Sequence, residues 1–193
     1  MLVATLVLVG VGAALLLGRP QEEAAGFTGS LRPAIPPKDF RLTDQDGRPA
    51  GLRELRGEVV VLTFLYTTCQ DTCPVTASTV GAALEAAGGD VPALTVSVDP
   101  AADTPSRARR FLAQRGLTGR MRFLLGQRPE LQPVWDDYAI SPQGVKGDDG
   151  AFEHSAYVLL IDRRGRQRVS FPFSTLTAED LAHDIRLLRA EPA

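Results

Sequence analysis

Cysteine and histidine are scarce in this chain: each occurs twice among 193 residues. The lack of a third cysteine counts against a structural zinc site, because such sites normally have four protein ligands. No basic stretch is interleaved with aromatic residues and the net charge is −2, so nucleic acid is not expected as a partner. Internal repeats and low-complexity segments are also missing, and the length fits one domain plus an appendage.

Charged side chains are absent from the first 18 residues, Met1 to Gly18, which are mostly leucine, valine and alanine. This length is the lower edge of a membrane span and also fits the core of a signal peptide. We favour an uncleaved transmembrane anchor over a cleaved signal, because no clear cleavage site follows Leu17. Both alternatives place the domain on the periplasmic or extracytoplasmic side of the membrane. The Pro-rich polar segment Arg19 to Pro37 is interpreted as a tether, and residues 38–193 as the folded domain.

Short apolar runs alternate with helical patterns along the rest of the chain. The predicted strands are Val59–Leu65, Ala93–Val98, Met121–Leu125, Ser155–Ile161 and Gln167–Phe171, with a small hairpin or strand at Phe40–Thr43. The predicted helices are Val75–Ala87, Pro105–Arg115 and Pro129–Tyr138, plus a last helix after Thr177. This order predicts an α/β fold with a mixed central sheet flanked by helices, in the thioredoxin-like arrangement.

The two cysteines, Cys69 and Cys73, follow the first long apolar strand directly. Pro74 fits the first turn of a helix that starts near Cys73, so both thiols are expected at a helix N-terminus. The unpaired N–H groups and the helix dipole favour thiolate at that position. Such a pair can form a disulfide, exchange with another disulfide, or bind a soft metal. A purely structural disulfide is a weaker alternative, since a loop closed over three residues restrains the unfolded chain little.

One of the two histidines is placed where it can join the cysteines. His154 ends a polar loop and precedes the strand Ser155–Ile161, and loops at strand ends meet at one edge of such a sheet. The alternative is an ordinary loop residue. His183 lies between apolar positions of the last helix and is interpreted as a surface residue. Two thiolates and an imidazole favour copper(I), with zinc as the rival metal.

From roughly Pro36 to Glu191, the chain resembles the SCO/SenC family. These are membrane-tethered, thioredoxin-fold copper proteins that help assemble the dinuclear copper site of cytochrome c oxidase. The Cys-x-x-x-Cys-Pro motif alone is not specific for this family, but a set of motifs that follow one another along the chain is. They are Thr68-Cys69-Gln70-Asp71-Thr72-Cys73-Pro74, Thr95-Val96-Ser97-Val98-Asp99-Pro100 with Asp103-Thr104-Pro105, Gly116-Leu117-Thr118-Gly119, and Glu153-His154-Ser155 before a strand closed by Ile161-Asp162.

The resemblance implies that Cys69, Cys73 and His154 are the metal ligands. Asp71 matches the acidic residue that the family usually has between the cysteines, and would support the site from outside the ligand set; the alternative is a solvated loop carboxylate. Asp99 is expected to turn the chain after its strand rather than touch metal.

Two further positions depart from the family pattern. Gln70 replaces a common proline and Thr68 a frequent histidine. Neither change removes a ligand, but both bear on the rigidity and redox behaviour of the loop.

These observations predict a copper metallochaperone that delivers copper to a receiving subunit of cytochrome c oxidase. Other copper chaperones or thiol reductants are expected as further partners. The alternative is an enzyme, a thiol–disulfide oxidoreductase that uses Cys69 and Cys73 as a redox-active disulfide to reduce a partner's copper-ligand cysteines. A third class is a redox-sensing or purely structural domain. The Cys-x-x-x-Cys spacing, with Glu153-His154 where a thioredoxin-type enzyme has a cis-proline, favours the chaperone.

Overall fold

The apolar run before the cysteines forms β4 (Val60–Leu65), and all six of its residues are buried. The computed structural model describes residues 26–142 and 157–192. Within these residues the other strands are β1 (Ser30–Ile35), β2 (Arg41–Asp44), β3 (Pro49–Gly51), β5 (Ala93–Ser97), β6 (Met121–Leu125), β7 (Tyr157–Ile161) and β8 (Gln167–Pro172). The helices are α2 (Thr72–Ala87), α3 (Pro105–Ala113), α4 (Arg128–Asp137) and α6 (Ala178–Ala190), with short 3-10 turns η1 (Arg53–Leu55) and η2 (Phe173–Thr175).

The strands form one mixed sheet in the order β1-β8-β7-β4-β5-β6-β2-β3. β4 lies in its interior and pairs parallel with β5 and antiparallel with β7. β2 and β3 form the hairpin that Phe40–Thr43 and the following turn predict. The mixed α/β sheet flanked by helices is therefore confirmed, and its arrangement brings the ends of β4 and β5 and the start of β7 to the same edge.

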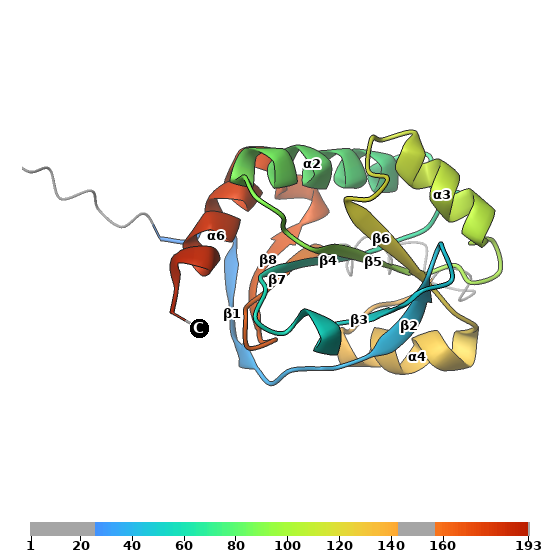
Figure 1. Ribbon diagram of the computed structural model, residues 1–193, viewed down its shortest axis with the longest axis horizontal. Coiled ribbons are helices and arrows are strands. Elements are labelled where there is room, and N and C mark those ends of the chain that lie inside the picture. Colours follow the sequence, from blue (N-terminus) through green and yellow to red (C-terminus); the bar gives the residue numbers. More distant parts are fainter. Residues whose placement is uncertain (1–25, 143–156, 193) are drawn as a thin grey trace, which may run out of the picture.

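The sheet separates two hydrophobic cores because successive side chains of a strand point to opposite faces. On β4, Val61 and Leu65 belong to the core beneath α2, α3 and α6, whereas Leu62 and Phe64 belong to the core beneath α4. Figure 1 shows this layering, with α2, α3 and α6 on one side of the strands and α4 on the other. Both faces of β4 are buried against hydrophobic side chains, which explains its continuous apolar sequence.

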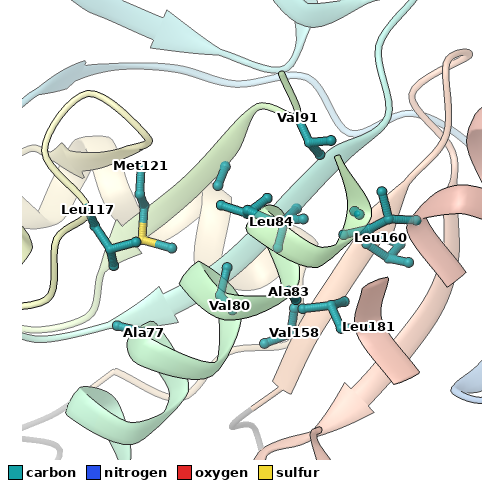
Figure 2. Packing of buried hydrophobic residues seen from close by; sticks show 14 of the residues in the cluster. Ala77, Val80, Ala83, Leu84, Val91, Leu117, Met121, Val158, Leu160 and Leu181 are labelled. Atoms are coloured by element: carbon teal, nitrogen blue, oxygen red, sulfur yellow. The ribbon is translucent and has the colours of Figure 1, made fainter. Parts of the chain in front are cut away.

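Helix α2 carries the second cysteine and is fixed along its length by small and branched side chains. Ala77, Val80 and Leu84 face the sheet core and are almost completely buried. Figure 2 shows α2 packed between Leu117 and Met121 on one side and β7 with Leu181 of α6 on the other. This packing orients the first turn of α2, and hence the cysteine site.

The helix boundaries differ slightly from the predicted ones. α2 begins at Thr72, next to the start near Cys73 that Pro74 indicates and three residues before the helical pattern Val75–Ala87, so that Cys73 and Pro74 lie inside its first turn. Thr104, one of the two residues before Pro105 that could cap this helix, caps α3 by accepting the Arg107 N–H at 3.3 Å. The helix predicted around Pro133 forms as α4 despite this internal proline.

The predicted tether is replaced in part by a strand, because Ser30–Ile35 forms β1 and pairs antiparallel with β8 at the edge of the sheet. An edge strand accepts Pro33, whose missing N–H costs no ladder bond there. The fully buried carboxylate of Asp184 in α6 accepts the backbone N–H groups of Thr28 and Gly29, each at 2.9 Å. These bonds anchor the chain ahead of β1, so the folded region begins before Lys38.

The predicted anchor, Met1 to Gly18, lies outside the described residues. Across residues 26–142 and 157–192, no helix is long and apolar enough to cross a membrane.

Candidate metal centre

Both cysteines lie where β4 delivers the chain to the N-terminus of α2, as the sequence predicts. Cys69 is in the connecting loop and half-buried, while Cys73 is the second residue of α2 and completely buried. The Cys73 backbone N–H donates to the sulfur of Cys69 at 3.3 Å. The Cys69 sulfur thus accepts an N–H group from the first turn of α2, where unpaired N–H groups stabilise negative charge.

The sulfur of Cys69 is surrounded by hydrogen-bond donors. Burial disfavours its thiolate, but donors outweigh this: the backbone N–H and thiol of Cys73, the backbone N–H of Asp71 and the Tyr66 hydroxyl. Together they hold the pKa of Cys69 below its usual value. A thiolate is the form that binds soft metals and attacks disulfides, so the lowered pKa favours both reactions at Cys69.

Cys73 behaves in the opposite way. Burial raises the pKa of its thiol well above the ordinary value, and hydrogen bonding to Cys69 and the negative charge of Cys69 and Asp103 add to this, against a bond from the Tyr66 backbone N–H. The two thiols are therefore unequal. Cys69 is half-buried with a lowered thiol pKa, whereas Cys73 lies in the core with a raised one.

Tyr66 contributes to the site although no sequence pattern singled it out. It directly follows β4, is half-buried, and packs against both hydrophobic cores. Burial, followed by its hydrogen bond to Cys69, raises the pKa of its hydroxyl far above the usual value, so the phenol stays protonated and acts as a donor. Its position at the strand end nearest the cysteines is the signal by which it could have been found.

Asp103 is the second residue that sequence reasoning missed as part of the site, because Asp103-Thr104-Pro105 reads as a helix start. Its buried carboxylate accepts the Thr67 N–H at 2.7 Å, the Thr67 hydroxyl at 2.6 Å and the Ser97 hydroxyl at 2.6 Å. Burial raises the pKa of Asp103, with the nearby charge of Asp99 adding to the increase against these three hydrogen bonds. The residue links two strand ends at the edge where the cysteines lie.

The remaining residues that the sequence analysis singled out are His154, Asp71, Asp99 and His183. His154 lies outside the described residues. Asp71 is exposed at the N-cap of α2 without a capping bond from its side chain. Asp99 turns the chain after β5, since its carboxylate and its backbone carbonyl both accept the Ala102 N–H. His183 lies on α6, with Nε2 3.4 Å from the Gly26 carbonyl oxygen, in accord with a surface role.

Two cysteines alone do not complete a three-coordinate metal site. In the described part of the chain, no group of three or more histidine, cysteine or acidic side chains is placed to hold a metal ion. The soft donor pair Cys69 and Cys73 fits copper(I), which accepts two or three ligands of this kind.

Comparison with known proteins agrees with the fold and shows the family. The family model SCO1/SenC matches residues 30–189. The SCO2-like protein of Rickettsia felis is 28% identical over 170 residues, which cover 82% of each chain. The copper-bound structure of Bradyrhizobium japonicum ScoI is 31% identical, with a TM-score of 0.67, over 80% of this chain and 99% of that one.

A further solved structure supports the fold alone. BsSco is a member of the Sco family of cytochrome c oxidase assembly proteins, in which a disulfide switch was identified. It is 24% identical, with a TM-score of 0.69, over 82% of this chain and 96% of that one. Since the family model covers nearly all of the described residues, this chain belongs to the SCO1/SenC family.

Proposed function

We propose that this protein is a copper metallochaperone that binds its cargo between Cys69 and Cys73 and passes it to a partner by ligand exchange. The observation that carries the proposal is the contact of the two cysteines at the N-terminus of α2, where donors stabilise the Cys69 thiolate. Binding the metal replaces the proton of the buried Cys73, which makes loading depend on pH and on reduced thiols. The copper-bound Bradyrhizobium relative supports the choice of metal.

His154 is proposed as the third ligand, supported by the position of the strand that follows it. The antiparallel pairing of Thr63 with Val158 brings the start of β7, Tyr157, beside the end of β4. His154 precedes Tyr157 by three residues, and three residues of extended chain span at most about 10 Å. β7 therefore starts at the edge of the sheet where Cys69 and Cys73 lie. An imidazole there would raise the preference for copper(II), which favours nitrogen ligands.

The surroundings of Cys69 suit transfer to another protein. The exposed residues Gln70, Asp71 and Thr72 line one end of an open hollow of about 470 Å³ beside the cysteine loop. We propose that a partner's thiolate approaches the cysteine loop from this side, while the completely buried Cys73 stays covered by the core. We propose the copper-receiving subunit of cytochrome c oxidase as the recipient, with Asp71 near the metal but outside the ligand set.

Anaerobic titration of the reduced protein with copper(I) tests the proposal directly. We expect one tightly bound copper per chain, with sulfur ligands in the X-ray absorption spectrum, because one pair of adjacent thiols is present. Prior oxidation to the disulfide serves as the control and should abolish binding. Binding that is weak, or equally strong in the oxidised protein, would contradict the chaperone function.

We further propose that Met1 to Gly18 anchors the domain on the outer side of the membrane, since this apolar segment precedes β1. Protease added to intact spheroplasts is expected to digest the domain. The same treatment of a cytoplasmic marker protein is the control. A domain that resists protease until lysis would refute this topology.

Thiol–disulfide oxidoreductase activity is the second candidate function, and the unequal thiols favour it. An accessible thiolate at Cys69 can attack a partner's disulfide, and the buried Cys73 thiol can then displace the partner. In this reaction the partner gains two electrons and two protons while Cys69 and Cys73 form a disulfide. This activity needs no third ligand, so the two candidates differ in their dependence on His154.

A further inference from the structure

The Asp103 carboxylate holds together two segments that are distant in sequence. It lies in the connection between β5 and α3, is 7% exposed, and bonds to Thr67 in the cysteine loop and to Ser97 at the end of β5. Thr67 donates both its N–H and its hydroxyl to the same oxygen, at 2.7 and 2.6 Å. Because one donor is a backbone group and the other a side-chain group, the two bonds fix both the backbone and the side chain of Thr67.

The carboxylate is itself held in a rigid frame. Its own backbone N–H donates to the Asp99 carbonyl at 2.9 Å, and Ser97 Oγ also accepts the Asp99 N–H at 3.2 Å. The Ser97 carbonyl in turn accepts the indole N–H of the fully buried Trp135 at 3.0 Å. A continuous chain of hydrogen bonds therefore leads from the α4 core to Thr67, two residues before Cys69.

We propose that Asp103 is a positioning residue for the thiolate site, which holds Cys69 in place through Thr67. This inference rests on the proposed copper-binding function of the cysteines. The loop needs such a support, because Thr68, Gln70 and Asp71 are exposed. Fixing the backbone at Thr67 restricts where the Cys69 sulfur can lie relative to the buried Cys73. A dithiolate held at a constant separation loses less conformational entropy when it closes on a metal or forms a disulfide.

Two substitutions weaken the contact between Asp103 and Thr67: one removes the acceptor and the other removes one of the two donors. Asp103→Ala leaves Thr67 without its acceptor, and Thr67→Val removes the hydroxyl donor while keeping a side chain of similar shape. Thr67→Ser keeps both donors and should behave like the parent. Loss of an outer hydrogen-bond partner typically weakens metal binding by about 10–100-fold. We expect a decrease on the order of tenfold in copper(I) affinity for Asp103→Ala, a smaller decrease for Thr67→Val and none for Thr67→Ser.

The second readout needs no metal. The equilibrium between the Cys69–Cys73 dithiol and its disulfide, measured in glutathione buffers, reports the effective concentration of one thiol at the other. A looser loop should lower the equilibrium constant for disulfide formation in Asp103→Ala by about tenfold, a shift of roughly 30 mV toward easier reduction. If the parent binds no copper, the proposed function fails, but this equilibrium still decides whether Asp103 positions Cys69.

Asp162→Asn is the control, because it perturbs another buried carboxylate that accepts backbone N–H groups, one that also pairs with Arg166 and Arg168. Asp162 is 5% exposed and accepts the N–H groups of Arg164 and Arg166, each at 2.9 Å, in the turn between β7 and β8. That turn lies at the opposite end of the sheet from the cysteines. Asp162→Asn should lower stability to urea and leave copper affinity and the disulfide equilibrium unchanged.

The outcomes separate positioning from a general effect on stability. If Asp103→Ala and Thr67→Val alter the disulfide equilibrium and Asp162→Asn does not, the positioning role is supported. The proposal is overturned if Asp103→Ala changes stability alone, or if Asp162→Asn alters the site equally. Should Asp103→Ala fail to fold, Thr67→Val against Thr67→Ser gives the same decision: equal disulfide equilibria in these two variants would also overturn it.

Discussion

Replacing Cys73 with serine is expected to abolish tight copper(I) binding, although the exchanged atom is completely buried. The hydroxyl has nearly the shape of the thiol but is a hard donor that keeps its proton, so a single thiolate remains for the metal. The loss of affinity should exceed the roughly 10–100-fold effect of removing an outer hydrogen-bond partner, because a ligand itself is lost. Competition with a chromophoric copper(I) chelator measures the change.

Two controls distinguish loss of a ligand from loss of the fold. Cys73→Ala should lose copper to the same extent without placing a hydroxyl in the core, where an unsatisfied polar group costs about 1–3 kcal/mol. In both variants Cys69 should still react with iodoacetamide, since it is half-buried and keeps the backbone N–H groups of residues 71 and 73 and the Tyr66 hydroxyl, which lower its pKa. The reaction should slow as the pH falls through that lowered pKa and the thiolate is protonated. Undiminished copper(I) binding in either variant would remove Cys73 from the ligand set.

Changing His154 to alanine is expected to separate the two oxidation states of copper. Two thiolates can still hold copper(I) in a linear site, whereas copper(II) prefers more ligands, including nitrogen. The variant should keep much of its copper(I), lose most copper(II), and lose any visible thiolate-to-copper(II) charge-transfer band. Absorption spectroscopy and metal analysis of the loaded protein measure all three.

His183→Ala is the matched control for this experiment, because it removes the chain's other histidine from the middle of α6. It should bind both oxidation states as the parent does. A thiol–disulfide oxidoreductase, by contrast, should show little change in metal binding after His154→Ala, since its copper would be adventitious. Should His154→Ala keep the parent's spectrum and both affinities, His154 is no ligand and the oxidoreductase function becomes the better explanation.

The sequence by itself determined the architecture around the cysteines. The continuous apolar segment Val60–Leu65, followed by two cysteines and Pro74, predicts a buried strand that leads into a helix, and the structure has both. The alternation of apolar runs and helical patterns similarly predicted the mixed α/β sheet. These features are local: each depends on neighbouring residues whose periodicity and turn chemistry are visible in the sequence. The position of Cys69 and Cys73 at the junction of strand and helix, and the role of Asp99 in a turn, are local features of the same kind.

The tertiary structure decided what depends on contacts between distant segments. Burial in the core between α2 and the sheet made Cys73 unlike Cys69, although both are cysteines in one short motif. Pairing with β8 turned part of a Pro-rich segment into β1, because an edge strand needs only one partner and tolerates Pro33. Asp103 reads as a helix-capping residue, yet it meets Thr67, 36 positions earlier, because β4 and β5 lie side by side and end at the same edge. Such pairings follow from the order of strands in the sheet, which the pattern of a single sequence does not encode.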